Sequence, residues 1–557
     1  MEKYIGLGVS DFKEVIKEDI YYIDKTMYIK EIIDSKDKVV LVTRPRRFGK
    51  TLNMSMLRYY FDNRVKDSKE LFNGLKIMDQ DEKYLKEMNK YPVIYLSLAG
   101  LKTENKEKMI IGLKSLIMEL YQEHRYLLES DKLYEEDKQK IKEILNAKED
   151  EVALERSLKD LCIYLERHYG EMPIVLVDEY DVPLQNAYVY GYYEEAINFI
   201  RSFYTSVLKD NLHMKKAILT GVSRIAKENL FSGLNNLSVS TVMDNRFTDL
   251  FGFTENEVKQ LLDYFNISEN MVDVKKWYDG YKVGNVDGIY NPWSILNFAR
   301  EQELKPYWVN TSSNDLIKMI LQKSTIVKQK IEKLLKDEEV EITANFDTIL
   351  NDIEKNENNV WGLFISTGYL KVTEKVDITE GIFKVKIPNL EIRSLFSQII
   401  KSWFIEKTNG IEIREMLNDL ITLNFESYSR KFRKIVVEMF SYFDVGEDTA
   451  ENFYHAFVLG MLVNLKDTYY IRSNRESGLG RYDIMLEPSD KKEIAFIMEF
   501  KVYDEEDDEK EISETLQNAK RQIEKKAYEI ELKSRGYENI KKVVYAFKGK
   551  QVELELY

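Results

Sequence analysis

The chain has little of several residue types, and each shortage excludes a class of protein. It contains one cysteine, Cys162, so no intramolecular disulfide can form, and we predict that this residue lies on a buried helix face. Eight prolines and 24 glycines in 557 residues are too few for a collagenous or low-complexity chain. No apolar run approaches the ~18 residues of a membrane span, and the charged N-terminus is unlike a signal peptide. We therefore expect a reducing, cytoplasmic location and no membrane partner.

Positive charge is also in deficit. The 82 lysines and arginines stand against 96 aspartates and glutamates, which gives a net charge of −14. No global positive field attracts nucleic acid, so a nucleic-acid partner would need a local basic surface. The 26 phenylalanines and 37 tyrosines exclude intrinsic disorder, and at roughly 150 residues per domain the length predicts about three or four folded domains.

Four apolar, strand-like runs alternate with helical sequence in the first 250 residues. They are VVLVT at 39–43, VIYLSL at 93–98, IVLVD at 174–178 and AILTG at 217–221. Fully apolar strands separated by helices are typical of a parallel sheet covered on both faces, so the fold class is α/β. The charged segment at about 103–170 has helical periodicity and is interpreted as a helical insertion.

The rest of the chain divides into helical and mixed segments. The pattern becomes helical from 253, and 277–293 is expected to be ordered but irregular, because Gly and Pro interrupt its aromatic residues. A helix, hairpin and helix order at 361–396 is compatible with a winged-helix module. Helical sequence follows to 466, and the last ninety residues or so return to strands.

The first strand leads into RPRRFGKT at 44–51 and then into helical sequence. A P-loop has Gly at its first position, four free residues and then Gly-Lys-Ser/Thr, so that backbone N–H groups surround phosphates. Arg44 stands at the first Gly position here. We expect Arg46, Arg47, Phe48, Gly49, Lys50 and Thr51 to bind ATP, with Lys50 on the β and γ phosphates and Thr51 on Mg²⁺.

Two adjacent carboxylates end the third strand. We predict that Asp178 holds Mg²⁺ and that Glu179 orients or deprotonates the attacking water; the alternative is that both acids merely end a buried strand. The fourth strand ends in polar residues, where Thr220 or Ser223 would sense the γ-phosphate. Arg224 would stabilise its charge, with a structural salt bridge as the competing interpretation.

A second constellation lies near the C-terminus, on two expected neighbouring strands. Asp483 lies on the first, and Glu499, Phe500 and Lys501 on the second. Residues two apart on a strand share a face, so Glu499 and Lys501 project together while Phe500 faces the core. If Asp483 meets them, two carboxylates can hold a divalent cation and the lysine can position or activate water. The alternative is a partly exposed ion pair in a domain without activity.

The residues around this constellation are less informative. A helix with Glu451 and His455 precedes the strands, and packing is the favoured role for His455 over metal binding. The acidic run at 504–511 would repel a nucleic-acid backbone, or only favour the start of the next helix. His124, His168 and His213 lack metal-ligand spacing.

The motifs RPRRFGKT, VDEYD, TGVSRIAKENLFSGLNNL, WYDGY and YNPWS together resemble bacterial and archaeal AAA-ATPase-like proteins of the STAND and archaeal-type grouping. Many of these carry a C-terminal PD-(D/E)xK nuclease-like domain, of the restriction-endonuclease-like α/β fold. The resemblance implies an AAA-type P-loop core at about 1–255 with a helical lid behind it and a C-terminal nuclease-like domain. Combined with the sequence pattern, it leads us to expect the lid region at 256–345, a winged-helix or helical linker at 346–430 and the nuclease-like domain at 431–557. It implies Asp483, Glu499 and Lys501 as active-site positions. Gln522 and Tyr528 are similar to the glutamine and tyrosine motif of many relatives, at a longer spacing.

We therefore expect an ATP-hydrolysing protein coupled to a metal-dependent nuclease, with Mg²⁺ at both sites or Mn²⁺ at the second. The resemblance favours DNA as the substrate and leaves RNA open. The alternative is an ATP-switched regulatory protein whose last domain binds nucleic acid or protein without cutting. A third hypothesis is ATP-dependent homo-oligomerisation, with Arg46, Arg47 or Arg224 reaching a neighbour's nucleotide.

Overall fold

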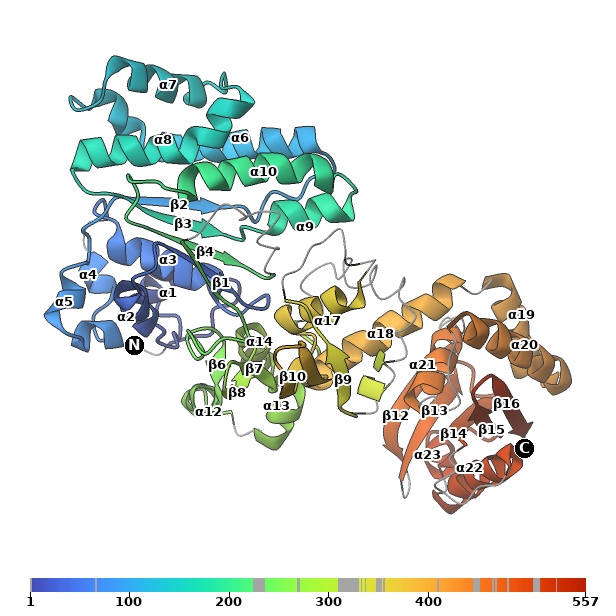
Figure 1. Cartoon of the computed structure of the whole chain (residues 1–557). Helices are drawn as coiled ribbons and strands as arrows, with labels where there is room; N and C mark the ends of the chain where they lie inside the picture. Colours follow the sequence, from blue (N-terminus) through green and yellow to red (C-terminus); the bar gives the residue numbers. More distant parts are fainter. Residues whose placement is uncertain are drawn as a thin grey trace. The chain divides into compact units, whose positions relative to one another are not determined.

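The first part of the chain is built around a five-stranded parallel sheet (Figure 1). Its strands are β1 (Val39–Thr43), β2 (Val93–Ser97), β3 (Ile174–Asp178), β4 (Lys216–Gly221) and β5 (Leu237–Ser240), in the order β2-β3-β4-β1-β5. Every neighbouring pair is parallel, and all residues of β1 and β3 are buried. The predicted α/β class is confirmed, and β4 separates the P-loop strand from the strand that ends in Asp178.

The computed structural model describes most of the residues of the chain. They are 3–65, 68–223, 236–267, 271–308, 330–331, 333–335, 337–346, 353, 356–407, 410–443, 451–462, 465, 468–477, 480–503, 511–526 and 528–557. The chain divides into two units, Met1–Leu316 with Glu341–Ile392 and Ile317–Val340 with Arg393–Tyr557.

Helices cover both faces of the parallel sheet. Figure 1 shows α8 and α10 on one face and α3 with α1 on the other. The helices that precede β3 are α1 (Phe12–Lys17), α2 (Met27–Asp34), α3 (Lys50–Phe61), α4 (Ser68–Leu71), α5 (Glu82–Leu85), α6 (Lys106–Glu123), α7 (Glu135–Leu145) and α8 (Glu151–Tyr169), with 3₁₀ turns at Lys76–Asp79 and Arg125–Glu129. After β3 come α9 (Val182–Val189) and α10 (Tyr193–Leu208). The segment 103–170 is thus helical as predicted, and Cys162 is buried in α8.

A small three-stranded sheet follows the parallel one. It has the order β6-β8-β7, with β6 (Phe253–Thr254), β7 (Tyr281–Val283) and β8 (Val286–Tyr290), and it is accompanied by α12 (Glu255–Tyr264), α13 (Met271–Tyr278) and α14 (Pro292–Glu301). The expectation of an irregular segment at 277–293 is wrong, because β7 and β8 pair as an antiparallel hairpin. Gly284 makes the tight turn with φ of 57°, so the glycine signal marked a hairpin rather than irregular chain.

The predicted helix, hairpin and helix order around 361–396 is confirmed. It consists of α17 (Glu357–Ser366), β10 (Lys371–Asp377), β11 (Ile382–Lys386) and α18 (Leu390–Lys407). The hairpin belongs to a three-stranded sheet, β10-β11-β9, whose third strand is β9 (Val340–Thr343). Assignment of this segment to a winged-helix module stays a prediction.

The second unit contains a five-stranded mixed sheet with the order β12-β13-β14-β15-β16. Its strands are β12 (Tyr469–Ser477), β13 (Gly480–Pro488), β14 (Ala495–Val502), β15 (Ile540–Lys548) and β16 (Gln551–Leu556). The helices are α19 (Gly410–Ile421), α20 (Phe425–Phe443), α21 (Glu451–Leu462), α22 (Ile512–Lys526) and α23 (Glu529–Ser534). β14 and β15 are parallel, because α22 and α23 form the crossover between them, and the other pairs are antiparallel. The predicted strands are present, and β16 adds one that sequence reasoning missed.

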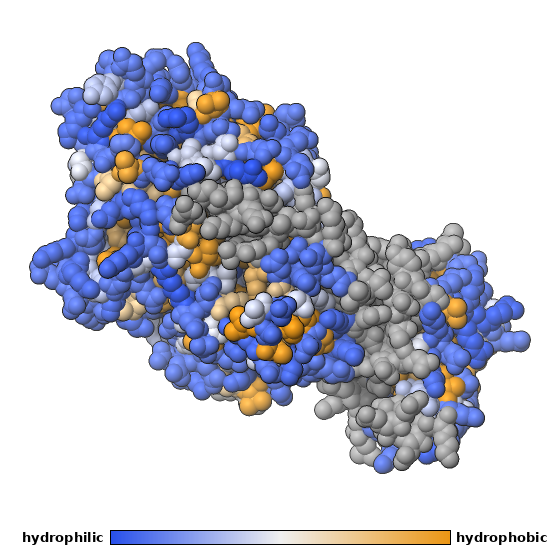
Figure 2. Space-filling model, viewed as in Figure 1, coloured by the Kyte–Doolittle hydropathy of each residue, from blue (hydrophilic) through white to orange (hydrophobic). Residues whose placement is uncertain are grey.

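Surface composition agrees with the polar sequence. In the view of Figure 2, hydrophilic residues cover most of the described surface, and hydrophobic residues gather in a few places. None of the helices in the described ranges combines the length and the apolar composition that crossing a bilayer requires.

The YIDKT segment at 22–26 joins distant parts of the first unit. The Lys25 ammonium donates to the carbonyl of Asp249 at 2.6 Å and to both carboxylate oxygens of Glu257 at 2.7 Å. Asp24 accepts hydrogen bonds from the backbone N–H groups of Thr26 and Lys76. These contacts tie the N-terminal segment to the start of α12.

We expect Lys25→Met to lower the free energy of unfolding of the first unit by about 3 kcal/mol, because removing one partner leaves the other charge uncompensated. The Lys25 side chain is only 9% exposed. Denaturant titration followed by circular dichroism measures the change. Lys13→Met on the exposed side of α1 is the control, and equal stability of the two variants would contradict the assignment.

Candidate nucleotide-binding and nuclease sites

The loop between β1 and α3 has the backbone geometry of an anion site. Gly49 precedes the first residue of α3 with φ of 80°, where a side chain would be strained. The next residue, Lys50, is buried and donates from Nζ to the carbonyl oxygens of Arg44 at 3.0 Å and Pro45 at 2.9 Å. Burial lowers the pKa of Lys50, and the nearby carboxylates of Glu179 and Asp178 oppose that shift. The Lys50 side chain therefore lies beside the N-terminus of α3.

Asp178 joins the ends of two strands to the first turn of α3. Its Oδ2 accepts a hydrogen bond from Thr51 Oγ1 at 2.7 Å, and its Oδ1 accepts one from Thr220 Oγ1 at the end of β4. Glu179 follows with φ of 54°, an uncommon conformation for a residue other than glycine. Burial raises the pKa of Glu179, while the Lys50 charge lowers it. The structure thus brings together four of the residues predicted for ATP chemistry: Thr51, Asp178, Glu179 and Thr220.

The residues present fit a magnesium–nucleotide complex. A hydroxyl and a carboxylate already in contact, Thr51 and Asp178, are oxygen ligands of the kind that Mg²⁺ prefers. The acceptors of Lys50 are loop carbonyls, which a phosphate can replace with a stronger, charge-assisted partner. The N-terminus of α3 supplies backbone N–H groups for the same anion.

Arg44, at the place of the first P-loop glycine, turns into the protein. It is fully buried and donates to the carbonyl oxygens of Thr43, Ser240, Arg246 and Phe247 at 2.9 to 3.2 Å. Its guanidinium also lies 5.5 Å from the centre of the Phe251 ring. Burial lowers the pKa of Arg44 to about 10, which leaves it charged at neutral pH. Arg44 therefore connects the loop between β1 and α3 to the end of β5 and to residues 246–247 by hydrogen bonds.

The small sheet and its helices support the loop from outside. The carbonyl of Arg46 accepts hydrogen bonds from Trp308 Nε1 at 3.1 Å and Asn291 Nδ2 at 3.3 Å. The Arg47 guanidinium lies 4.5 Å from the centre of the Trp293 ring, and the buried Phe48 ring packs edge-on against another aromatic ring, that of Tyr281. Because its side chain is packed, Phe48 could contact a phosphate only through its backbone. The roles of Arg46 and Arg47 in ATP binding stay predictions.

A buried carboxylate, Glu391, holds this supporting layer. It accepts hydrogen bonds from Trp308 N at 2.7 Å and from Ser294 Oγ at 2.8 Å. Burial raises the pKa of Glu391 to about 7, and these hydrogen bonds lower it in part. Glu391 lies in the first turn of α18, so the same helix end fixes the segment that contacts the loop.

The nuclease-like constellation lies on the adjacent antiparallel strands β13 and β14. Their pairing ends with Ile484 opposite Met498, and the next positions in this register are Asp483 and Glu499. The backbone N–H of Phe500 donates to Asp483 Oδ2 at 2.8 Å, which joins the two strands at the site. The Phe500 ring stacks on the buried Tyr545 ring, with 4.9 Å between the ring centres, so the Phe500 side chain lies on the core side as predicted.

Neighbouring charges and a side chain of α22 surround the two carboxylates of this site. Burial raises the pKa of Asp483, while the Phe500 hydrogen bond and the Lys501 charge lower it. Glu499 is fully buried and accepts a hydrogen bond from Gln522 Nε2. Burial and the neighbouring Glu499 charge raise the pKa of Tyr528. The longer spacing of Gln522 and Tyr528 thus still brings both side chains to the carboxylates.

Other predicted residues around the nuclease-like site are outside the described part of the chain. α21 contains positions 451 and 455, but the side chains of Glu451 and His455 are not among those described. Most of the acidic run, 504–510, is also outside the described residues. Within the described ranges, no group of three or more His, Cys, Asp or Glu residues could hold a metal ion. A cation at this site would therefore rest on the pair Asp483 and Glu499, with the nucleic acid and water supplying further oxygens.

Comparison with known families identifies both parts of the chain. Residues 6–231 match the family described as predicted AAA-ATPase, and residues 449–555 match the PD-(D/E)XK nuclease superfamily. The chain thus carries an AAA-ATPase-like domain and a PD-(D/E)XK domain. This confirms the resemblance drawn from the motifs. The chain is also 26% identical over 428 residues, 76% of its length and 75% of the relative's, to an uncharacterized protein in the vnfD 5' region of Azotobacter chroococcum.

One residue of the AAA-ATPase-like domain was missed by sequence reasoning. Asp181, the last residue of VDEYD, is fully buried, and its Oδ2 accepts hydrogen bonds from Val222 N, Ser223 N and Ser223 Oγ at 2.9 to 3.0 Å. It thereby fixes the chain leaving β4, where Ser223 was predicted to sense phosphate. Its place as the third acidic residue of VDEYD was the sequence feature that could have indicated this role. Arg224 lies outside the described residues.

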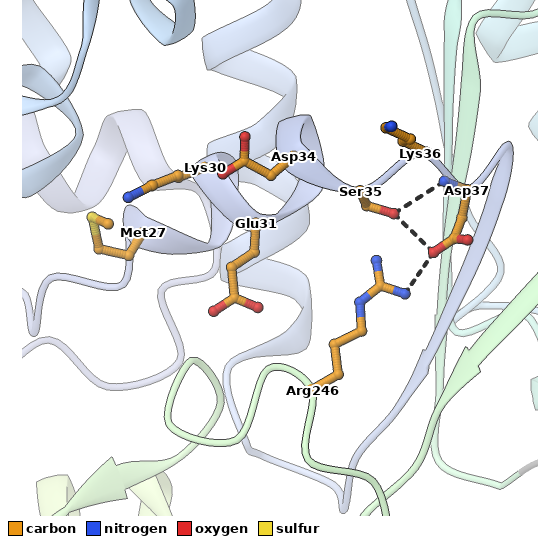
Figure 3. Close-up of a pocket in the computed structure, with 8 residues that line it drawn as sticks. All are labelled: Met27, Lys30, Glu31, Asp34, Ser35, Lys36, Asp37 and Arg246. Carbon is orange, nitrogen blue, oxygen red and sulfur yellow. Dashed lines mark hydrogen bonds and ion pairs between the residues drawn. The ribbon is translucent and has the colours of Figure 1, made fainter.

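A surface hollow of the same unit lies beside α2, and its lining includes none of the residues assigned to the nucleotide site (Figure 3). Charges of both signs line it, and its residues are Met27, Lys30, Glu31, Asp34, Ser35, Lys36, Asp37 and Arg246. Arg246 donates to Asp37 at 2.7 Å, and Ser35 Oγ donates to the same carboxylate at 2.8 Å. Figure 3 shows these contacts linking Ser35, Asp37 and Arg246 with one another, and we assign the hollow no ligand.

We expect Arg44→Gly, which restores the general P-loop pattern, to destabilise the AAA-ATPase-like domain by about 3 kcal/mol without strengthening ATP binding. Several buried carbonyls lose a charged donor, and each such hydrogen bond contributes about 1.5–3 kcal/mol. Denaturant titration and ATP titration measure the two effects. Arg58→Ala removes a partly exposed ion pair with Glu123 and serves as the control. A stable variant with tighter ATP binding would show that Arg44 acts otherwise.

Proposed function

We propose that this protein binds and hydrolyses ATP at the P-loop and cleaves DNA by metal-dependent phosphodiester hydrolysis at its C-terminal domain. The observation that carries the proposal is the contact of Asp178 with Thr51 and Thr220 beside the buried Lys50. The AAA-ATPase-like and nuclease-superfamily matches support both halves. In this proposal, ATP turnover controls how the second domain engages nucleic acid.

At the first site, the chain's own groups bind and orient the reactants. Lys50 leaves its two carbonyl acceptors and donates to the β and γ phosphates, while backbone N–H groups at the start of α3 hold the same oxygens. Thr51 and Asp178 would hold Mg²⁺, which neutralises phosphate charge when bound. Glu179, with its raised pKa, accepts a proton from the attacking water. Asp181 keeps the 222–223 segment in place.

At the second site, Asp483 and Glu499 would hold the divalent cation, which supplies Lewis-acid stabilisation of the phosphodiester when bound. Lys501 follows Glu499 by two residues and so faces the same side of β14. There its ammonium positions the attacking water and balances charge on the phosphate. Gln522 fixes the orientation of the Glu499 carboxylate through its hydrogen bond. Mn²⁺ is expected to replace Mg²⁺ at this oxygen-lined site.

Variants of Lys50 and Glu179 distinguish ATP binding from ATP hydrolysis. Lys50→Ala should abolish phosphate release and weaken ATP binding, because the charge-assisted contacts are lost. Glu179→Gln should bind ATP with near-normal affinity and turn over at least about 100-fold more slowly, as expected for loss of a general base. Phosphate release and fluorescent-nucleotide titration measure the two quantities.

The matched control for ATP turnover is Lys36→Ala, a lysine outside the nucleotide site. Wild-type phosphate release by both Lys50→Ala and Glu179→Gln would contradict the P-loop assignment. Mass in solution with and without ATP tests the proposed ATP-dependent assembly, and an unchanged monomer rules it out.

Cleavage of linear, circular, single-stranded and duplex DNA with Mg²⁺ or Mn²⁺, each with and without ATP, tests the second activity. Glu499→Ala and Lys501→Ala should both lose cleavage. The first removes a metal ligand, and the second removes the ammonium that positions water and balances the phosphate charge. Removal of the divalent cation with a chelator should have the same effect on the wild type.

Absence of DNA cleavage in every condition, with ATP turnover intact, would favour the ATP-switched protein whose last domain binds without cutting. RNA substrates form the parallel arm of the assay. The control variant is Lys492→Ala, at an exposed turn before β14, which should cleave as the wild type does.

A further inference from the structure

A second lysine, Lys526, is the last residue of α22, the helix that packs against the nuclease-like site. This helix packs on the sheet face that holds the two carboxylates, where Ala519 and Ile523 join a buried cluster with Met485 and Ile497. Met485 lies two positions from Asp483 along β13, and Ile497 two positions from Glu499 along β14. Because alternate strand residues share a face, α22 covers the side of the sheet toward which Asp483 and Glu499 project.

The helical period places Lys526 on the inner side of α22. Thr515, Ala519, Gln522 and Lys526 recur at intervals of four, three and four residues, which is one face of a helix with 3.6 residues per turn. Thr515 and Ala519 are fully buried, and Gln522 and Lys526 are half-buried. Lys526 therefore continues the stripe that begins against the sheet.

Gln522 fixes the position of this stripe relative to the site. Its Nε2 donates to Glu499 Oε1, so this turn of the helix is in direct contact with the buried carboxylate. Lys526 lies one turn further, about 6 Å along the helix axis. Lys526 thus lies on the face of α22 that contacts the carboxylate pair through Gln522.

The neighbouring lysine gives a measure of how specific this placement is. Lys525 also lies in the last turn of α22, where either lysine would stabilise the helix dipole. It is rotated by about 100° from Lys526 around the helix and is exposed. A role in the helix dipole alone would make the two residues equivalent, whereas their orientation toward the site differs.

We propose that Lys526 is a phosphate-binding residue of the nuclease-like site, which contacts the nucleic-acid backbone beside the bond that is hydrolysed. This inference rests on the proposed nuclease function. A lysine ammonium is a compact positive charge that suits a phosphate oxygen without demanding a fixed geometry. With Lys501 on β14 and Lys526 on α22, two cations flank the carboxylates, which supplies the local basic surface that a chain of net charge −14 requires.

The test compares the full-length wild type with Lys526→Ala, Lys526→Arg and Lys525→Ala. Binding of a fluorescein-labelled 30-base-pair duplex is titrated in chelator, where no cleavage occurs, at several salt concentrations. Lys526→Ala should bind about tenfold more weakly and should reduce the slope of log affinity against log salt by about 1, as for one lost phosphate contact. With Mg²⁺ or Mn²⁺, it should lower kcat/KM for cleavage at least tenfold.

Lys526→Arg should recover most of the binding and the salt slope, because it keeps the charge. Lys525→Ala should match the wild type, and thermal unfolding checks that all variants are folded. If the wild type cleaves DNA and Lys526→Ala equals Lys525→Ala in slope and kcat/KM, the inference is wrong and the nuclease function stands. If the wild type neither binds nor cleaves DNA or RNA, the proposed function itself fails, and this inference fails with it.

Discussion

The AAA-ATPase-like domain depends on one carboxylate at the edge of its parallel sheet. Asp178 ends β3 and accepts hydrogen bonds from Thr220 on β4 and Thr51 at the start of α3. Since α3 follows β1, this carboxylate links the C-terminal ends of the neighbouring strands β3, β4 and β1, at the position where a nucleotide's phosphates would lie. Asp181, three residues later, extends the arrangement by holding the 222–223 segment. The sheet order β3-β4-β1 makes these contacts geometrically possible.

Support for the phosphate loop comes from two sides, and both use residues far away in the sequence. Arg44 attaches the loop to the end of β5 and to the 246–247 turn, so the missing glycine is replaced by a buried structural cation. Asn291 and Trp308 hold the Arg46 carbonyl from the small sheet and its helices, and Glu391 holds Trp308 in turn. The motifs YNPWS and WYDGY, which had no chemistry of their own in the sequence, lie in this supporting layer.

The second unit uses the same principle with a smaller set of groups. Two strands bring Asp483 and Glu499 together; Gln522 on α22 contacts Glu499, and Tyr528, the N-cap residue of α23, lies near the same carboxylate. The spacing between Gln522 and Tyr528 is longer than in the usual motif, yet both lie near the carboxylates. Their common position depends on how α22 and the start of α23 pack on the sheet, which residue spacing alone does not define.

Local sequence was sufficient wherever periodicity and adjacent residues carry the information. It predicted the parallel strands, the helical insertion, the C-terminal strands, the P-loop and the pairing of Glu499 with Lys501 on one strand face. Tertiary structure alone decided the direction of the Arg44 side chain, the hairpin at 281–290 and the role of Asp181. It also decided that the face of α22 carrying Gln522 and Lys526 is the one that meets Glu499. Each of these depends on partners dozens or hundreds of residues away, or on which helix face is buried. Hydrophobic patterning shows that a residue is buried, but only the folded chain determines against which partner.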